Sequence, residues 1–337
     1  MASAIFYSIV DRKGARRFSV RHSVLVMTTS RKQAICEKIA ELKKHTFFDP
    51  TYDPVFKRIF KKKKNLIHFL NAILRLKNKR EIVSVTHLRP SVDLRTPKKG
   101  KKITRFDIHA RTRDGRFIDI EMQRAWHDDF LDRIELYSAM LSINAKIAMD
   151  EKMPQKQRKE HPYLMPTVYS IWICNFDVEF CRGYREEFSL FRHSDLGKRK
   201  PLPVYPKKRY IIIDLTKYVP QEGNSPEKQW IELFRNMPTA KEVPPGTDKA
   251  IRDVYGDLLV SKANKSFITE VATNMDEGEI MMMKAAERRI AAIRRKGIAE
   301  GEARAHKKTK ARDKKIVDFL RANGVAAKLL NAAMAIK

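Results

Sequence analysis

The segment 106–123, which reads FDIHARTRDGRFIDIEMQ, constrains the fold of this chain more than any other. Apolar and polar residues alternate on both sides of Asp114 and Gly115, which is the pattern of two antiparallel strands joined by a tight turn. The even-numbered positions from 106 to 110 and from 118 to 122 are apolar, whereas the odd-numbered positions between them are polar. We therefore predict a β-hairpin with one apolar face and one face in contact with water.

The length of the turn decides which side chains of this hairpin meet. A two-residue loop would set Asp107 opposite Met122 and bury the polar side chains of one strand. A three-residue loop that ends with Gly115 in the left-handed conformation sets Asp107 opposite Glu121 and gathers the apolar residues on the other face. We predict this second register, with the two carboxylates about 5 Å apart at Cβ. Because like charges that face each other destabilise a sheet, the pair requires a cation.

Two carboxylates with a further polar side chain nearby suit a hard divalent cation. Mg²⁺ accepts few protein oxygens and leaves its remaining positions to water and phosphate. The sequence supplies Asp107, then Glu121 and Gln123. We therefore expect Mg²⁺ at this pair, with Mn²⁺ as an alternative. His109 is expected at the rim of the site, and Asp119 as a solvated strand residue.

Further blocks of sequence flank the hairpin in a fixed order. FDPTYDPVFKRIF begins at Phe48 and LNAIL at Leu70, while FLDR begins at Phe130 and is followed by Tyr137. Together the blocks resemble the PD-(D/E)XK nuclease superfamily, specifically its branch of recombination-promoting nucleases and transposases. The resemblance extends from about Phe47 to the C-terminus. It implies an α/β (α+β) fold: a restriction-endonuclease-like mixed β-sheet core flanked by helices, with a helical C-terminal extension.

The resemblance implies a metal-dependent DNA endonuclease that hydrolyses phosphodiester bonds. It assigns Mg²⁺ to Asp107, Glu121 and the backbone carbonyl of Met122. The superfamily motif ends in lysine, but this branch commonly has glutamine there, as at Gln123. A neutral amide can orient a water molecule but cannot accept its proton, and loss of a general base typically slows a reaction by ~10²–10⁴-fold. Slow cleavage is therefore expected.

An acidic residue on the first helix of this superfamily often approaches the metal, and Asp53 occupies that position. Asp53 and Pro54 also form a typical helix start, with Asp as the N-cap and Pro at the first helical position. Both roles remain open, and one residue can fill both. The candidate catalytic residues are therefore Asp53, Asp107, Glu121 and Gln123.

Several side chains near these blocks are candidate contacts for DNA. Arg133 and Tyr137 lie one helical turn apart, and the resemblance places them beside the metal; a packed helix with a solvated guanidinium is the alternative. Lys57 follows Asp53 by one turn and can reach a phosphate, although exposed lysines are usually just solvated. A lysine run comes next, which is either part of the same basic surface or ordinary solvated surface. Its members are Lys61, Lys62, Lys63 and Lys64.

The charge of the chain points to a polyanionic partner. The 337 residues carry a formal net charge of +30, and lysines and arginines gain affinity by releasing counterions from phosphates. DNA is the expected partner, ahead of an anionic membrane. No run approaches the roughly 18 apolar residues of a membrane span, and we expect a cytoplasmic protein. The three cysteines form no CxxC pair, so neither a zinc site nor a disulfide framework is supported.

The expected organisation is a basic N-terminal segment (1–45), a nuclease-like domain (46–265) and a charged helical C-terminal extension (266–337). Recognisable blocks begin late, which leads to the hypothesis that translation naturally starts at Met27. The expected strands outside the hairpin are 81–88, 166–176 and 209–215, the main expected helix is 128–149, the stretch 89–102 is expected to be a basic turn, and 151–160 a linker.

Two other functions fit part of the sequence. A catalytically silent DNA-binding accessory protein of a mobile element explains the charge equally well. However, phosphate binding alone favours neutral or basic groups over two carboxylates on one polar face. A packaging protein has no need of such well-patterned strands and aromatic residues. Cutting both strands of DNA usually takes two protomers or two successive nicks, which leaves a homodimer open.

Overall fold

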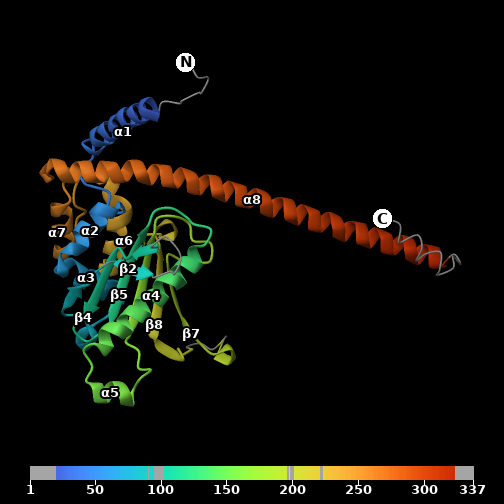
Figure 1. The fold of residues 1–337 in the computed structure, drawn as a ribbon, viewed down its shortest axis with the longest axis horizontal. Coiled ribbons are helices and arrows are strands. Elements are labelled where there is room, and N and C mark those ends of the chain that lie inside the picture. The colour runs from blue at the N-terminus through green and yellow to red at the C-terminus, as the bar shows by residue number, and fades with distance from the viewer. Residues whose placement is uncertain are drawn as a thin grey trace, which may run out of the picture. The chain divides into compact units, whose positions relative to one another are not determined.

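The computed structural model describes residues 20–89, 91–94, 102–195, 197, 201–220 and 223–322. The chain divides into two compact units, Met1–Met282 and Met283–Lys337. One long helix, α8 (Lys265–Ala322), begins in the first unit and continues into the second (Figure 1). The first unit contains a β-sheet with helices on both faces, and it includes every residue of the predicted catalytic hairpin.

The first unit is built on a mixed six-stranded sheet with the strand order β1-β4-β5-β6-β8-β7. These strands are β1 (Val85–His87), β4 (Ile108–Thr112), β5 (Phe117–Gln123), β6 (Val168–Cys174), β7 (Arg185–Leu190) and β8 (Tyr205–Asp214). Neighbours are antiparallel from β1 to β5, parallel from β5 to β8, and antiparallel again between β8 and β7. The prediction of a mixed sheet flanked by helices is confirmed.

Helices cover both faces of the sheet (Figure 1). One face packs against α2 (Asp53–Lys61), α3 (Lys63–Ile73), α6 (Pro226–Asn236), α7 (Lys249–Asp257) and the first turns of α8. The other face packs against α4 (Phe130–Asp150). The remaining helices are α1 (Val20–Leu42), α5 (Gln155–Glu160) and the short 3₁₀ helices Asn78–Arg80, His193–Asp195, Leu215–Lys217, Met237–Thr239 and Val260–Lys262.

Alternation along the strands divides the apolar residues between two cores. Ile118 and Ile120 of β5 belong to the large core, together with side chains of α2, α3, α6 and α7. On the opposite face, Trp172 of β6 packs with Phe130 and Ile134 of α4. Trp172 and Trp230 are both fully buried and belong to the cores on opposite faces of the sheet.

The prediction that the polar face of the hairpin contacts water is wrong. All seven residues of β5 are buried, because the apolar stripe of α4 packs over that face. Asp119, which was expected to be solvated, has no exposed surface (0 %). Strands that are parallel to a neighbour normally have both faces covered, and β5 is parallel to β6.

Three further segments differ from the sequence-based expectations. The predicted basic turn (89–102) contains β2 (Ser91–Leu94) and ends at the first residue of β3 (Lys102–Arg105); the two strands pair antiparallel in a separate two-stranded sheet. The edge strand β7 was not predicted. The expected linker at 151–160 contains the short helix α5. No helix in the described ranges is both long enough and apolar enough to cross a membrane.

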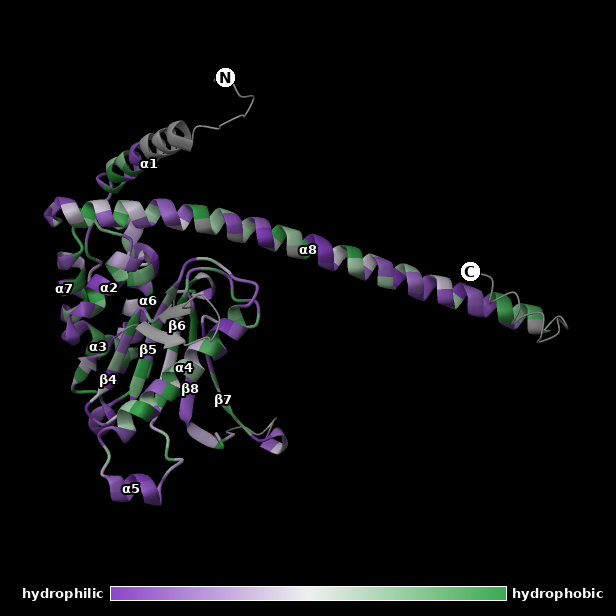
Figure 2. Ribbon diagram, viewed as in Figure 1, coloured by the Kyte–Doolittle hydropathy of each residue, from purple (hydrophilic) through white to green (hydrophobic). Residues whose placement is uncertain are grey.

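The second unit contains the continuation of α8 from Met283 to Ala322. Where side chains of this segment are described, they are exposed or half-buried. Figure 2 shows hydrophilic and apolar residues interspersed along the whole helix. Gly297 and Gly301 lie inside it without ending it. A charged helical run was expected here, and the structure agrees for the residues it describes.

Candidate active site

The hairpin has the register that the turn chemistry predicts. Ile108 pairs with Ile120 and Arg111 with Phe117, and the Thr112 N–H donates to the carbonyl oxygen of Arg116 at 2.9 Å. Gly115 closes the three-residue loop with φ +86°, in the left-handed region. The prediction that Asp107 lies opposite Glu121 is therefore confirmed.

The two carboxylates are held by reciprocal hydrogen bonds to the backbone. Strand β4 begins only at Ile108, so the N–H of Met122 donates to Asp107 Oδ2 at 2.9 Å. In return, the N–H of Asp107 donates to Glu121 Oε1 at 3.0 Å. Both acids are thus fixed at the open end of the hairpin. Because the N–H and C=O of a strand residue point to the same side, the Met122 carbonyl is directed towards Asp107.

The backbone break at Asp107 also redirects Phe106. This residue was expected on the same face as Ile108, but it packs in the opposite core with Phe117 and Met140 of α4. Its ring centroid lies 5.7 Å from that of Tyr137. The alternation therefore holds from Ile108 onward and fails one residue before Asp107.

Burial is the largest cause of the raised pKa values of the two carboxyl groups. Burial raises the pKa of Asp107 to about 6; the hydrogen bond from Met122 opposes this rise and the negative charge of Asp53 adds to it. Burial also raises the pKa of Glu121 well above its usual range, and the carboxyl groups of Asp119 and Asp107 raise it further. Concentrated buried negative charge of this kind is stabilised by a cation.

Asp119 and His109 are two further buried polar residues of the hairpin, next along the strands from the two acids. They are cross-strand partners, and no donor group satisfies either carboxylate oxygen of Asp119 within the described structure. Burial raises the pKa of Asp119, and the charge of Asp107 adds to that effect. His109 donates from Nδ1 to the carbonyl oxygen of Arg89 at 3.1 Å, and it is buried instead of lying at the rim. Burial lowers the pKa of His109 and favours its neutral form.

Gln123 and Arg133 both reach Glu121. The Gln123 amide donates from Nε2 to Glu121 Oε2 at 3.3 Å. Arg133 Nη2 lies 3.9 Å from the same oxygen and donates to the Tyr137 hydroxyl at 3.3 Å. The structure therefore brings Arg133 and Tyr137 of α4 beside the carboxylates. Both side chains also pack against the face of the sheet that α4 covers.

Asp53 and Lys57 approach from α2 on the other side of the pair. Helix α2 begins at Asp53, so Tyr52 is the N-cap, and no side chain caps the helix. The expectation that Asp53 is the N-cap is therefore wrong. Its carboxylate instead pairs with Lys57 Nζ at 2.7 Å, and Lys57 Nζ lies 4.0 Å from Asp107 Oδ1.

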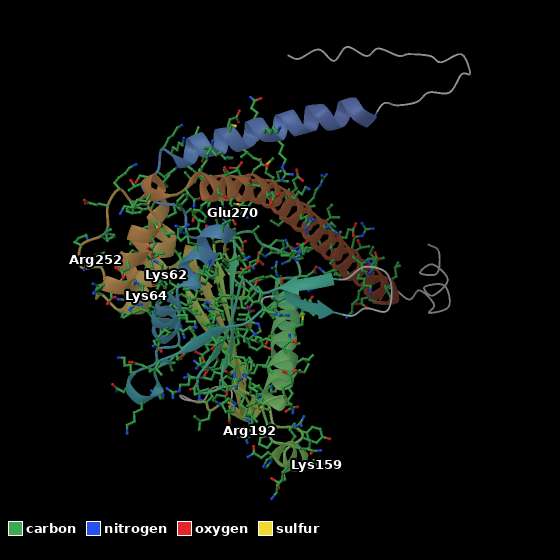
Figure 3. The ribbon with its side chains drawn as sticks, turned by 60° about the vertical axis from the view of Figure 1, so that its left-hand side comes forward. Lys62, Lys64, Lys159, Arg192, Arg252 and Glu270 are labelled. Carbon is green, nitrogen blue, oxygen red and sulfur yellow. The ribbon has the colours of Figure 1, made fainter. Side chains whose placement is uncertain are left out.

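The lysine run makes ion pairs away from the carboxylates. Lys62 pairs with Asp257 and Lys64 with Asp253, both on α7. Figure 3 shows Lys62 and Lys64 on the same side of the molecule as Arg252, away from Lys159 and Arg192. Lys61 and Lys63 are exposed.

Three residues of the site were missed by sequence analysis. The guanidinium of Arg124 lies over the Tyr52 ring, 3.6 Å from its centroid. Asn274 of α8 accepts a hydrogen bond from the Asp53 N–H at 3.3 Å. One turn later, a Cβ on Gly278 would lie 3.7 Å from Arg124 Nη1. Arg124 follows Gln123 directly, but nothing in the sequence indicates that α8 returns to this place.

The donors at the hairpin end fit a hard cation. Among the described residues, no group of three or more His, Cys, Asp and Glu side chains has the arrangement of a metal site. Two carboxylates and one carbonyl oxygen are nevertheless typical of Mg²⁺, which keeps several waters and binds substrate phosphate. Burial raises the pKa of Asp107, Glu121 and Asp119, so their ionised forms need a cation to offset the buried negative charge, which supports this fit.

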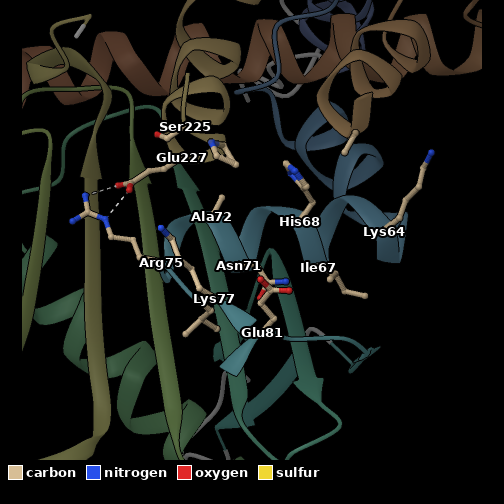
Figure 4. Close-up of a pocket in the computed structure, with 13 residues that line it drawn as sticks. Lys64, Ile67, His68, Asn71, Ala72, Arg75, Lys77, Glu81, Ser225 and Glu227 are labelled. Carbon is tan, nitrogen blue, oxygen red and sulfur yellow. Dashed lines mark hydrogen bonds and ion pairs between the residues drawn. The ribbon is translucent and has the colours of Figure 1, made fainter. Parts of the chain in front are cut away.

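A separate cavity of about 880 Å³ lies between α3 and the starts of α6 and α7 (Figure 4). Its polar lining is paired within the chain. Arg75 Nε, for example, donates to Glu227 Oε2 at 2.7 Å, and the His68 ring accepts from Trp230 Nε1 at 3.0 Å. This cavity is lined by none of the predicted site residues except Lys64.

The mixed sheet between two helical layers, with two acids at the end of a central hairpin, defines the fold class as restriction-endonuclease-like. The family model described as PD-(D/E)XK nuclease family transposase matches residues 50–288. The chain belongs to this family, which confirms the resemblance. No curated protein and no solved structure gives a match.

Proposed function

We propose that the protein is a Mg²⁺-dependent DNA endonuclease of a mobile element, of the transposase or recombination-promoting nuclease type. The observation that supports this best is the pair formed by Asp107 and Glu121, fixed by reciprocal backbone hydrogen bonds at the open end of a buried hairpin. A protein that only bound phosphates would gain nothing from two buried acids, because carboxylates repel the DNA backbone.

Asp107, Glu121 and the Met122 carbonyl would hold the ion. Mg²⁺ bound there supplies Lewis-acid chemistry: it polarises a phosphoryl oxygen and lowers the pKa of a bound water. The chain's own contribution is to set the ligands in advance and to exclude bulk water from Glu121, whose side chain is 1 % exposed. Because the ligands must be deprotonated, ion binding releases the protons that burial favours on these acids.

Gln123 and Arg133 orient Glu121. Both side chains contact Oε2 of Glu121, so the carboxylate has one defined rotamer and leaves Oε1 near the Asp107 backbone. A glutamine cannot act as a general base. Cleavage is therefore expected to be slower, by ~10²–10⁴-fold, than with an effective base at this place.

DNA would approach the open end of the hairpin, where Lys57 of α2 and Arg133 and Tyr137 of α4 flank the carboxylates from the two faces of the sheet. Lys57 is the most exposed of the cations described within 4.0 Å of the pair, at 44 %. The exposed Lys61 and Lys63 extend the positive surface along α2 and α3. We assign these residues to phosphate contacts that position the duplex without reading its sequence.

The test is nicking of supercoiled plasmid with Mg²⁺ or Mn²⁺. Wild-type protein is expected to nick, and Asp107→Ala or Glu121→Ala to lose at least ~10²-fold in rate, since each removes a ligand of the ion. DNA affinity, measured by fluorescence anisotropy in Ca²⁺, is expected to change little. Glu242→Ala, at an exposed acid outside the site, is the matched control. Equal nicking in chelator, or an active Glu121→Ala protein, would contradict the proposal.

Gln123 favours one second candidate, a DNA-binding accessory protein without turnover. Its amide is engaged with Glu121, and β5 carries no ammonium group in its place. The same experiment separates the two functions: an accessory protein binds plasmid but leaves it supercoiled at every metal concentration.

A further inference from the structure

The site lacks a positive charge on the strand that carries Glu121. Gln123 is neutral, only 9 % exposed, and donates its amide to Glu121 Oε2. An amide at this place cannot stabilise the negative charge that develops on a phosphoryl group as an ammonium can. If the chain cleaves DNA, that charge has to be met from another element.

Two cations in the described part of the chain lie within 4.0 Å of the carboxylate pair. Arg133 Nη2 is 3.9 Å from Glu121, but its guanidinium is already shared between the Tyr137 hydroxyl and the rings of Tyr137 and Trp172. Lys57 Nζ is 4.0 Å from Asp107 Oδ1. Its other described contact is Asp53, and its side chain is 44 % exposed. Lys57 is therefore the cation that an incoming phosphate can reach.

The fold fixes where Lys57 lies. It is the central residue of α2, whose opposite face buries Val55, Phe56, Ile59 and Phe60 in the large core. The start of this helix is tied to α8 through the hydrogen bond from the Asp53 N–H to Asn274. Asp53, four residues before Lys57, holds the ammonium on the side that faces Asp107.

We propose that Lys57 supplies, from helix α2, the positive charge that a lysine at position 123 would supply from β5, and that it contacts the scissile phosphate. This inference rests on the proposed nuclease function. In the hydrolysis, the water oxygen bonds to phosphorus as the bond to the leaving oxygen breaks. The proton lost by the water goes to solvent, and the leaving oxygen takes one from solvent. Lys57 transfers no proton and acts through its charge alone.

Exchange of the charge between the two elements tests the proposal. Lys57→Gln is expected to slow Mg²⁺-dependent plasmid nicking by ~10²-fold, the usual cost of losing one donor that stabilises a transition state. Gln123→Lys in the Lys57→Gln background is expected to restore at least ~10-fold, because it returns the charge to β5. Lys241→Gln, which removes the same charge from an exposed position outside the site, is the control. Unchanged nicking by Lys57→Gln, or no restoration in the double variant, overturns the proposal.

Metal affinity gives a second readout that needs no turnover. An ammonium 4.0 Å from Asp107 repels a divalent cation, so Lys57→Gln is expected to bind Mn²⁺ several-fold more tightly in calorimetry, while Lys241→Gln does not. Tighter metal binding with slower cleavage is a combination that loss of structure does not produce. Unchanged or weaker Mn²⁺ binding by Lys57→Gln overturns the inference. If wild-type protein nicks no plasmid, the proposed function fails, and the calorimetry alone decides whether the Lys57 charge acts on the pair.

Discussion

Asp119 is a fully buried carboxylic acid between the sheet and α4. Its ionised form destabilises the folded protein, so its effect on stability depends on pH. No basic, amide or hydroxyl group donates to its oxygens in the described structure. Burial and the charge of Asp107 raise its pKa well above the usual value of 3.8, and a hydrogen bond shared with the Glu121 carboxyl and the charge of Arg133 only partly oppose this rise. In the folded protein the group therefore holds its proton to higher pH than in the unfolded chain. Stability that comes from this difference is present at low pH and is lost as pH rises from about 4 upward.

Replacement of Asp119 by asparagine is expected to stabilise the metal-free protein more at pH 8 than at pH 5. The amide has no ionised form whose burial must be offset at high pH. The gain is expected to reach several degrees in melting temperature at pH 8, since 1 kcal/mol corresponds to roughly 2–4 °C for a domain of this size. Thermal denaturation of both proteins in chelator at the two pH values measures it.

Asp114→Asn in the same hairpin is the matched control with the opposite sign. Although burial opposes ionisation, the hydrogen bonds from Arg116 and Thr112 lower the pKa of Asp114. The ionised form therefore contributes stability that is lost as pH falls, and the variant should be less stable than wild type at pH 8. An Asp119→Asn gain that is equal at pH 5 and pH 8 would show that burial does not penalise the ionised carboxylate.

At the scale of elements, hydrophobic pattern and turn chemistry were sufficient for the parts of the fold that define the carboxylate pair. The three-residue loop at Gly115 and the alternation along β5 determined the register. A shift of one residue would place the polar side chains of one strand on the face that packs in the large apolar core. Burial of Asp119 was not predictable in the same way. It depends on α4, which packs on the sheet from a later part of the chain.

The elements that were missed lack a strong local pattern. Strand β7 reads REEFSL and is mostly half-exposed or exposed, so no apolar alternation indicates it. It forms because the free edge of β8 offers its backbone groups, and Arg185 and Glu187 make ion pairs beside it. The ribbon of β2 and β3 was hidden by its lysines, prolines and glycine, which are typical of turns.

Packing of Arg124 between α2 and α8 leads to a prediction about these elements. Arg124→Lys keeps the charge but loses the planar group that lies on Tyr52 and within 3.8 Å of Asp49. We expect a loss of about 1–2 kcal/mol in the free energy of unfolding, the range for a largely buried cation–π contact. Urea denaturation measures it.

Arg113→Lys, at an exposed position in the hairpin turn, is the control for this substitution. It is expected to change stability by less than about 0.5 kcal/mol. Because Tyr52 precedes Asp53 and Lys57, Arg124→Lys should also slow nicking, whereas Arg113→Lys should not. Equal stability of the two variants would mean that Arg124 does not fasten α2 to the end of β5.

At the scale of the whole molecule, the positive charge is distributed over two units with different composition. Residues 283–337 contain sixteen Lys and Arg but only five Asp and Glu, and the described side chains of this segment are exposed or half-buried. The buried residues of the large core end at Met275, inside the first unit. The blocks of sequence that identify the family predicted the fold of the first unit, whereas the second was predicted from the helical C-terminal extension that the resemblance implies and from its charged composition.

Truncation after Met282 is therefore expected to separate DNA affinity from cleavage. The shortened chain keeps both cores and the carboxylate pair, so its melting temperature and its Mg²⁺-dependent nicking at saturating DNA should stay close to those of the full chain. Its affinity for duplex DNA should fall, and the dependence of that affinity on salt should become shallower, by roughly 0.9 in log–log slope for each phosphate that the protein no longer neutralises. Fluorescence anisotropy between low and moderate salt measures both quantities. If the slope is unchanged, the basic helix does not bind DNA, and the excess charge of the second unit serves another partner.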